Sequence, residues 1–305
     1  MVTILLAVYN GEKYLKEQIE SLLNQTVKDI KIVIRDDGSS DNSVGIINEF
    51  CSRFPDKIFM ITGEPTGSAK QNFAKLLSSC DDDYIMFCDQ DDVWNPDKVE
   101  QSLKTMKDTE AGNKDLPVLV HTNLSVVDEK LNVISNSFFD FQKINYVMPL
   151  PQLLVQNNVT GCTVMINRAL KNKCGDIPSE CIMHDWWLAL VATSFGRLEC
   201  IREATMRYRQ HAGNQVGAKA SYGFAFIKRK LASLGEVRKN YNATYTQAKA
   251  FFENFGKDLE PNQYELIKTY CEIPKMCKFK KIKTINKYGF KKCTRLRLIG
   301  QYILM

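Results

Sequence analysis

The chain has 305 residues, of which 44% are hydrophobic and 25% charged, and its formal net charge is +6. This length and composition indicate a globular protein with a full core, built as one large domain with an appendage. A membrane-spanning protein is not expected, because no apolar run reaches the ~18 residues of a membrane span. A secreted protein is not expected either, because residues 1–9 lack the basic start and cleavage site of a signal peptide. Ten scattered cysteines without a CxxC pair indicate reduced thiols, so we expect a cytoplasmic protein.

The N-terminal part alternates short apolar runs with helical patterns. Residues 2–9 predict a buried parallel strand that Asn10 and Gly11 end, and residues 14–25 carry apolar residues at helical spacing. The alternation continues with strands at 30–34, 58–61 and 84–88 and with helices at 41–50 and 73–77. Strands joined by single helices predict βαβ units, a parallel sheet and a ligand crevice at the carboxyl ends of the strands.

The fourth strand, residues 84–88, stops on three carboxylates: Asp89, Asp91 and Asp92. Carboxylates this close repel one another unless a divalent cation lies between them, and oxygen ligands favour Mg²⁺ or Mn²⁺ over Zn²⁺. The alternative is that Asp92 caps a helix starting near Pro96 while the other two are solvated. Capping accounts for one carboxylate of the three, so we favour the metal.

The crevice lacks the usual phosphate-binding motifs, since the chain contains neither GxGxxG after the first strand nor GxxxxGK[ST]. An aromatic ring and an acceptor carboxylate instead suit a base with an imide N–H, such as uracil or thymine, and a lysine could help to neutralise a diphosphate. The residues that offer these groups are Ala7, Tyr9, Asn10, Asp36, Asp37 and Lys70.

At these residues the sequence resembles glycosyltransferase family 2, the inverting sugar-nucleotide enzymes with the GT-A fold. The resemblance covers residues 2–217 and depends on Val8-Tyr9-Asn10-Gly11, on Asp36-Asp37-Gly38-Ser39-Ser40-Asp41 and on Asp89-Gln90-Asp91-Asp92, which matches the family's DxD signature. It implies an α/β fold with a mixed, mainly parallel sheet, in which residues 1–110 form a Rossmann-like nucleotide-sugar-binding half and residues 111–217 an acceptor half. Residues 218–305 would then be a basic helical region outside the family domain.

The resemblance also implies a role for each matched residue. Asp37, together with Asp36, would contact the base, and Tyr9 and Ala7 would line its pocket. The acidic motif, Asp89-Gln90-Asp91, would serve the ribose and the metal–diphosphate. A Mn²⁺ or Mg²⁺ ion is expected because the leaving nucleotide diphosphate gains negative charge as the glycosidic bond breaks.

The acceptor half is expected to carry the catalytic base. Strands are predicted at residues 118–122, 124–127 and 159–166, and a short helix at 153–156. His184-Asp185-Trp186-Trp187 opens an apolar helix, where the family carries an acidic residue that takes the proton of the acceptor hydroxyl. Asp185 matches that residue, although it could simply cap the helix. His184 replaces the Glu that is frequent in the family, and it could orient Asp185 or simply pack, just as Trp186 or Trp187 could simply be core. Either His184 or Trp186 could instead contact the acceptor or the diphosphate.

Arg209 and His211 follow a strand predicted at residues 200–206, and Asn214 and Gly217 indicate a flexible loop behind them. Such a cationic segment could contact the diphosphate or the metal, or it could be a solvated strand end. Gly161-Cys-Thr together with His184-Asp185-Trp186-Trp187 is most similar to the bacterial rhamnosyltransferase-like branch. We therefore expect surface-polysaccharide synthesis with dTDP-rhamnose as donor, or a UDP-hexose as second choice, and a saccharide or lipid-linked saccharide as acceptor.

Two other classes of protein have to be weighed. Asp89-Gln90-Asp91-Asp92-Val93 also fits the motif of haloacid-dehalogenase-like phosphatases, with Asp89 as nucleophile and Asp91 as acid. That motif normally ends the first strand of its domain, whereas three strands precede it here. The other alternative is a non-catalytic protein that binds nucleotide sugars, but the full set of carboxylates argues against it.

The C-terminal region is strongly basic. Residues 228–305 contain eighteen Lys and Arg against six Asp and Glu, a balance of +12, whereas the rest of the chain has a balance of −6. Two amphipathic pieces are predicted around a break at Gly289, with Phe279, Ile282 and Ile285 on one apolar face and Phe290, Cys293 and Leu296 on the other. Residues 273–305 would bind an anionic membrane surface or pack on the catalytic domain as a helical hairpin. No nucleic-acid-binding module accompanies them, so we expect no nucleic acid partner.

Overall fold

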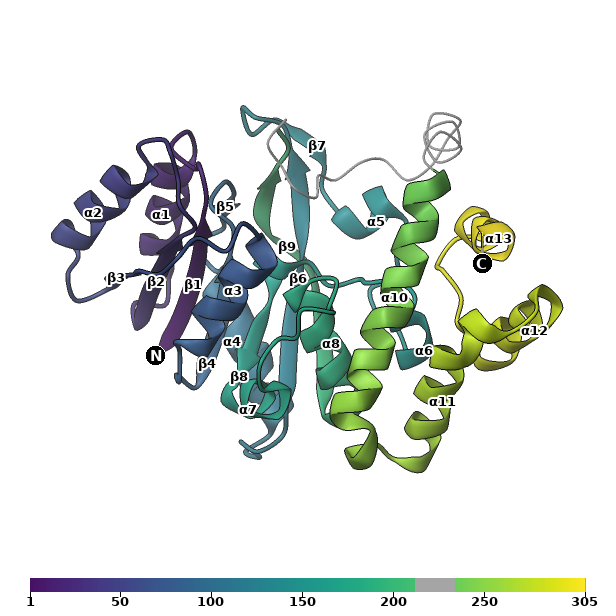
Figure 1. The fold of residues 1–305 in the computed structure, drawn as a ribbon. Helices are drawn as coiled ribbons and strands as arrows, with labels where there is room; N and C mark the ends of the chain where they lie inside the picture. Colours follow the sequence, from purple (N-terminus) through teal and green to yellow (C-terminus); the bar gives the residue numbers. More distant parts are fainter. Residues whose placement is uncertain (212–233, 305) are drawn as a thin grey trace. The chain divides into compact units, whose positions relative to one another are not determined.

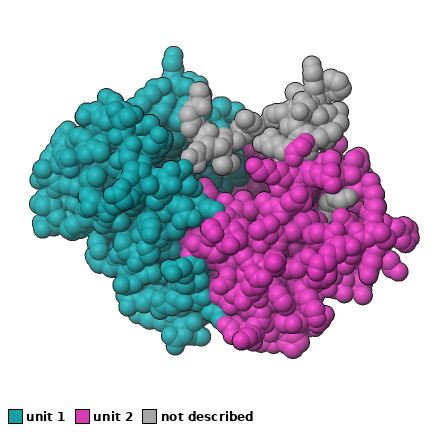
Figure 2. All heavy atoms as spheres, viewed as in Figure 1, with its two compact units in different colours: residues 1–138, 159–176, 196–218 teal, residues 139–158, 177–195, 219–305 magenta. Residues whose placement is uncertain are grey.

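The computed structural model describes residues 1–211 and 234–304 (Figure 1). The predicted loop at Asn214 and Gly217 lies outside the described residues. The chain divides into two compact units, which Figure 2 draws in different colours. Of the described residues, unit 1 comprises 1–138, 159–176 and 196–211, and unit 2 comprises 139–158, 177–195 and 234–304. The domain boundaries expected near residues 110 and 217 stay predictions.

Unit 1 begins with the predicted alternation of strands and helices. The parallel strands are β1 (Val2–Val8), β2 (Ile30–Asp36), β3 (Ile58–Ile61) and β4 (Tyr84–Cys88). The helices between them are α1 (Leu15–Leu23), α2 (Ser43–Arg53) and α3 (Ala69–Ser78). β1 lies between β2 and β4, and its interior residues are almost fully buried, as a parallel strand covered on both faces requires.

The second half of the sheet contains β5 (Val93–Trp94), β6 (Val118–Val127), β7 (Val133–Ser135), β8 (Met165–Asn167) and β9 (Arg197–Arg209). Its helices are α4 (Lys98–Glu110), α7 (Arg168–Cys174) and the short 3₁₀ helix η1 (Gly161–Thr163). The strand order is β3-β2-β1-β4-β8-β6-β9-β5, with β7 pairing with β6, and both parallel and antiparallel pairs occur. The expected α/β fold with a mixed, mainly parallel sheet is confirmed.

Three predicted elements differ from the structure. Residues 118–122 and 124–127 form one strand, β6. Asn123 between them lies at a bulge in the pairing with β9, which shifts the register without ending the strand, and its side chain accepts from the Leu124 amide. Of the strand predicted at 159–166, only residues 165 and 166 belong to a strand, β8, since Gly161–Thr163 turns as η1. The helix predicted at 153–156 lies earlier, at α6 (Leu150–Leu153), where a proline occupies its first turn.

Unit 2 is helical in its described part. Besides α6 it contains α8 (His184–Phe195), α10 (Leu234–Phe255), η2 (Gly256–Asp258), α11 (Pro261–Glu272), η3 (Ile273–Lys275), α12 (Lys278–Tyr288) and α13 (Arg295–Leu304). Aromatic rings form its core: Trp187 of α8 packs edge-on against Phe251 of α10, with centroids 5.5 Å apart, and Phe195 packs on Phe255 at the same distance. The expected helical C-terminal region is confirmed.

The break between the two basic pieces is where the sequence placed it, but the second piece is not helical from that point. Gly289 ends α12 with φ +78, a conformation that glycine adopts without strain. The helix α13 starts only at Arg295, so the predicted face of Phe290, Cys293 and Leu296 does not exist. Phe290 is fully buried, and Phe279 and Ile285 do not share a buried face, because Phe279 is 81% exposed and Ile285 is 0% exposed. Across the described residues, no helix is both long and apolar enough to cross a bilayer.

Candidate active site

The predicted donor-site residues gather at one edge of the sheet of unit 1. The register pairs Val8 with Asp36 and Leu6 with Cys88, so β1, β2 and β4 end side by side. Parallel strands with adjacent carboxyl ends form the edge at which open α/β sheets bind ligands. The sequence motifs that follow the three strands therefore meet in space, as their positions predicted.

Gln90 joins the ends of β1 and β4. Its amide oxygen accepts from the Tyr9 amide at 2.7 Å, and its amide nitrogen donates to the Tyr9 carbonyl at 2.9 Å. Gly11 lies close by, where a Cβ would come within 2.6 Å of the Gln90 amide oxygen, so a side chain there would displace the Gln90 amide. The two hydrogen bonds of Gln90 hold residues 89–92, which we call the acidic loop, against the end of β1. Tyr9 is left 55% exposed at the edge.

Asp36 and Asn10 shape the loop after β2. Asp36 accepts from the amides of Gly38 and Ser39 at 3.0 and 2.9 Å and from the Ser39 hydroxyl. Asn10 has φ +50, and its side-chain oxygen accepts from the Ser40 amide at 2.8 Å. These side chains fold the Asp-Asp-Gly-Ser-Ser loop in place, which is the usual use of Asp and Asn in turns.

Asp37 is the buried carboxylate of this loop, at 5% exposure. It accepts from Arg35 at 2.8 Å and from the amide and hydroxyl of Thr66 at 2.7 and 2.9 Å. Burial alone would raise the pKa of Asp37, but the hydrogen bonds from Thr66 and Arg35 outweigh it and lower the pKa below its ordinary value. Asp37 is therefore an ionised carboxylate at neutral pH and can only accept hydrogen bonds.

Ala7 and Lys70 lie at the same edge of the sheet. Ala7 is half-buried in β1 opposite Arg35, and Lys70 is the half-buried second residue of α3. Lys70 thus follows the loop that carries Thr66, the residue that binds Asp37. Their contacts with a base or a diphosphate stay predictions.

Asp91 is brought together with His211 from the far end of β9. The Asp91 carboxylate lies 2.7 Å from His211 Nε2, although 120 residues separate the two in sequence. The His211 ring also packs on Tyr14, with centroids 4.9 Å apart. A carboxylate and an imidazole nitrogen so placed form a pair of metal-ligand type in unit 1.

Arg209 is buried, at 3% side-chain exposure, beside this pair. Its guanidinium donates to the Asp91 carbonyl at 2.8 Å and to the Glu129 carbonyl at 2.6 Å, pairs with Glu17 and lies 4.5 Å above the Tyr14 ring. Its backbone amide donates to Asp92 at 3.0 Å. Arg209 therefore ties the acidic loop to α1 and to the turn after β6, and a guanidinium engaged in this way is not a solvated strand end.

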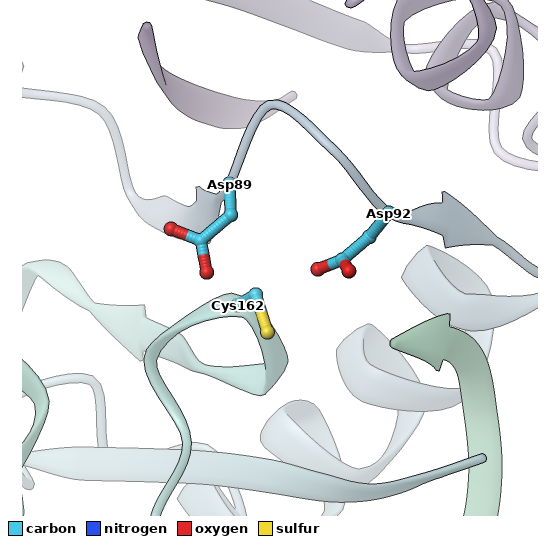
Figure 3. Close-up of side chains that lie close together, drawn as sticks. All are labelled: Asp89, Asp92 and Cys162. Atoms are coloured by element: carbon cyan, nitrogen blue, oxygen red, sulfur yellow. The ribbon is translucent and has the colours of Figure 1, made fainter. Parts of the chain in front are cut away.

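The other two carboxylates of the loop face a cysteine. Asp89, Asp92 and Cys162 of η1 offer ligand atoms within 4.8 Å of one another, and Figure 3 shows the three side chains close together. Asp92 is fully buried, and its Oδ2 has no hydrogen-bond partner among the described residues. Burial, followed by repulsion from Asp91 and Asp89, raises the pKa of Asp92 well above its ordinary value.

The proposed cap role of Asp92 is wrong. Asp92 precedes the short strand β5, and the N-cap residue of α4 is Asp97. Beneath the loop lies Lys98, fully buried, 4.6 Å from the Trp94 ring and 3.4 Å from the Thr205 hydroxyl. Burial lowers the pKa of Lys98 to about 8, while nearby acidic groups, Asp92 among them, oppose that shift.

The predicted acceptor residues belong to unit 2. The helix α8 begins at His184, so Asp185 is inside its first turn and is not the residue before it. Asp185 is 6% exposed and accepts from the Trp186 amide at 2.6 Å, and the Trp186 indole donates to the Leu153 carbonyl at 2.7 Å. His184 is 1% exposed, and burial lowers its pKa to about 3, so it is neutral at physiological pH.

The sequence did not predict several residues of the site. Thr66 and Arg35 hold Asp37, Glu17 pairs with Arg209, Cys162 faces Asp92, and Lys98 is buried below the loop. Arg35 carried a usable signal, since it precedes Asp37 by two residues in an apolar strand, where an arginine needs a partner. The others are brought in by tertiary contacts that no local pattern indicates.

Residues 3–169 match the family described as "Glycosyl transferase family 2". The matched range contains all three motifs after β1, β2 and β4. The chain belongs to glycosyltransferase family 2. This membership decides against the phosphatase, whose motif Asp89 and Asp91 also fit, and against a protein that only binds nucleotide sugars.

Individual relatives agree with the family. The chain is similar to a protein named dTDP-rhamnosyl transferase RfbG from Shigella flexneri, with 31% identity over 255 residues, 77% of this chain and 80% of that protein. Among solved structures, TarS of S. aureus aligns with TM-score 0.57 and 14% identity over 89% of this chain and 43% of that one. The mannosyltransferase PcManGT from Pyrobaculum calidifontis, in complex with GDP-Man and Mn²⁺, aligns with TM-score 0.54 and 14% identity over 99% of this chain and 86% of that one. These likenesses confirm the predicted GT-A fold.

Proposed function

We propose that this family 2 glycosyltransferase is an inverting, metal-dependent enzyme that transfers a sugar from a nucleotide-diphosphate donor to a hydroxyl of a saccharide acceptor. The observation that carries the proposal is the shared edge of β1, β2 and β4. There the ionised carboxylate of Asp37, which accepts hydrogen bonds, and the acidic loop, whose Asp91 is paired with His211, follow neighbouring parallel strands. The Asp37 end of this edge suits a nucleobase, and the Asp91 end suits a metal-bound diphosphate.

For the base we propose thymine or uracil. Asp37 can only accept hydrogen bonds, so it selects a base edge that offers N–H, and the imide of uracil or thymine does. Thr66 and Arg35 keep Asp37 ionised, and Tyr9, exposed beside it, offers a ring on which the base can stack. The relative named as a dTDP-rhamnosyl transferase supports dTDP-rhamnose as the first donor to test, and a UDP-hexose is the second.

For the metal we propose Mn²⁺, with Mg²⁺ as the alternative. The residues fit a divalent cation, since Asp91 and His211 form a ligand pair, and Asp89 and Asp92 add carboxylates, with the buried Asp92 Oδ2 lacking a hydrogen-bond partner among the described residues. An imidazole among carboxylates favours Mn²⁺ over Mg²⁺. When bound, the ion would stabilise the negative charge that develops on the leaving diphosphate.

For the chemistry we propose Asp185 as the general base. A neutral sugar hydroxyl must lose its proton as it attacks the anomeric carbon, and the attack inverts that carbon as the nucleoside diphosphate leaves on the opposite side. The Trp186 amide donates to the Asp185 carboxylate and fixes its orientation. His184, neutral and buried, would help to pack the start of α8 and would not act as an acid.

For the acceptor we propose a saccharide, free or linked to a lipid, used in bacterial surface-polysaccharide assembly. A lipid-linked acceptor lies in a membrane, so the enzyme would have to reach that surface. The basic residues 273–305 would attach the enzyme to the cytoplasmic face of the membrane.

The test is a panel of nucleotide sugars incubated with the full-length enzyme and Mn²⁺, with release of the nucleoside diphosphate followed by mass spectrometry. We expect dTDP-rhamnose to be hydrolysed fastest, and EDTA to abolish the signal. The variant Asp91→Asn keeps the size of the side chain but removes a charge, so Mn²⁺ affinity and donor affinity should fall together. Full activity in EDTA, or an Asp91→Asn enzyme with unchanged turnover, would refute metal dependence.

A further inference from the structure

The C-terminal helices of unit 2 expose more apolar surface than their surroundings. The structure describes ten large hydrophobic side chains as exposed, and four of them belong to α12 and α13. They are Phe279 at 81%, Leu296 at 40%, Ile299 at 55% and Ile303 at 63%. Single exposed hydrophobics are ordinary, but a group on two neighbouring helices indicates an interaction surface.

The contacts of α13 decide which of its faces is exposed. Gln301 is fully buried and donates to the Phe290 carbonyl at 2.7 Å, and Arg297 donates to the Gln142 carbonyl at 2.7 Å. Positions 297 and 301 are one turn apart and fix that face of the helix to unit 2. Ile299 and Ile303, also one turn apart, lie on the opposite face and are left exposed.

The start of α12 adjoins the end of α13, which extends the surface across both helices. Lys278 Nζ, at the start of α12, lies 3.5 Å from the Ile303 carbonyl, at the end of α13, so these two helices (Figure 1, yellow) adjoin there, and Phe279 is the next residue of α12. A second contact, from the Tyr302 hydroxyl to Asn286 at 2.9 Å, also joins the two helices. We name the surface formed by Phe279, Leu296, Ile299 and Ile303 the apolar stripe.

The surroundings of the apolar stripe carry charge of one sign. No Asp or Glu follows Glu272, whereas ten Lys and Arg occur from Lys275 to Arg297. Lys280, Lys283 and Lys287 of α12 are exposed. Apolar side chains surrounded by cations are the pattern of helices that lie in the interface of an anionic bilayer, with the apolar face in the acyl region and the cations at the headgroups.

We infer that the apolar stripe inserts into an anionic membrane leaflet while the lysines of α12 bind its headgroups. This inference deepens the proposed membrane attachment by naming the inserting side chains, and it is independent of the transferase chemistry. A second copy of this chain is a poor occupant, because two surfaces with ten cations each would repel one another. An anionic leaflet complements both the charge and the apolar side chains.

The first test is flotation of the full-length protein with vesicles of phosphatidylcholine alone or with phosphatidylglycerol added. We expect binding to the mixed vesicles and little to the neutral ones. The variant Ile299→Ser/Ile303→Ser keeps the charge and should lower the partition coefficient roughly tenfold or more, because the lost apolar area no longer enters the bilayer. The matched control is Val133→Ser/Val147→Ser, which removes two hydrophobic side chains exposed elsewhere, at 57% and 71%, and should bind like the wild type.

The second test reverses charge. Replacement of Lys280, Lys283 and Lys287 by Glu should lower binding to the mixed vesicles by roughly 10²-fold, since each basic residue near an anionic leaflet contributes about fivefold. The control is the same change at the exposed Lys104, Lys107 and Lys114 of unit 1, which alters net charge equally and should have a much smaller effect. Donor hydrolysis and the melting temperature should stay at wild-type values in every variant, which separates this inference from the proposed function.

Two outcomes would overturn the inference. If the serine variant floats like the wild type while the glutamate variant does not, attachment is electrostatic only and the stripe does not insert. If the wild type does not float and instead forms a dimer that the serine variant disrupts, the stripe is an interface between copies of the chain.

Discussion

Replacing Arg209 by Lys separates two roles for this residue, a contact with the donor diphosphate and a tether of the acidic loop. A lysine keeps the positive charge and can still bind a phosphate, so a diphosphate contact would be weakened only slightly. A tether requires the planar fork, which donates to the carbonyls of Asp91 and Glu129 while it pairs with Glu17. One ammonium cannot reach all three, so we expect the substitution to release the loop.

The magnitude follows from the groups that lose their donor. The Asp91 carbonyl would lose a buried donor, at about 1–3 kcal/mol, whereas the part-buried Glu129 carbonyl would lose less because water can replace its donor. The pair with Glu17 adds at most about 1 kcal/mol, because that carboxylate is 48% exposed and the pair is screened by solvent. With partial relaxation we expect a loss of about 3 kcal/mol in unfolding free energy, equivalent to roughly 6–12 °C in melting temperature for a unit of this size.

The assay combines thermal unfolding with calorimetric titration of Mn²⁺ and donor. Arg209→Lys should melt lower and bind Mn²⁺ more weakly, because Asp91 is no longer held beside His211. The control is Arg207→Lys on the same strand, where the side chain is exposed and no change is expected. An Arg209→Lys protein with wild-type melting and Mn²⁺ affinity but a raised KM for the donor would refute the tether and support the diphosphate contact.

Two further predictions concern the carboxylates of Asp185 and Asp37. Asp185→Asn should bind donor with near-wild-type affinity yet lose transfer by ~10²–10⁴-fold, and an equal fall in donor affinity measured by calorimetry would show that Asp185 is not the base. Thr66→Val removes one hydrogen bond from Asp37 and should cost about 1.5–3 kcal/mol at neutral pH. Because the folded pKa of Asp37 is lowered, that stability is present above its unfolded pKa of about 4 and is lost as pH falls through the folded pKa, so urea unfolding from pH 7 to pH 3 should show the difference between the two proteins narrowing at the acidic end.

The first four strands could be predicted from the sequence because each is a short apolar run between clear breaks. A parallel order follows from single helices between strands, and parallel strands put their carboxyl ends at one edge. The sequence alone therefore predicts that the motifs at Tyr9, Asp37 and Asp89 lie together. Alternation of this kind is local, and local patterns are what a sequence displays most directly.

The rest of the site depends on contacts between distant residues. The Glu17 and Arg209 side chains are 192 positions apart, and neither lies in a pattern that indicates the other. Cys162 reaches the acidic loop because Gly161–Thr163 turns as a 3₁₀ helix, whereas its apolar, β-branched neighbours predict a strand. The second half of the sheet mixes parallel and antiparallel pairs, so its order could not be derived from the alternation of elements.

The acidic loop carries more negative charge than its protein surroundings offset, and this imbalance supports the proposed metal. Burial, followed by repulsion from Asp91 and Asp89, raises the pKa of Asp92. Of the nearby cations, Arg209 is paired with Glu17, and Lys98 is so buried that its own pKa falls to about 8. The fold thus holds carboxylates close together although their repulsion costs stability, which is the expected arrangement where a ligand brings positive charge. Mn²⁺ should therefore raise the melting temperature of the wild type more than that of Asp91→Asn.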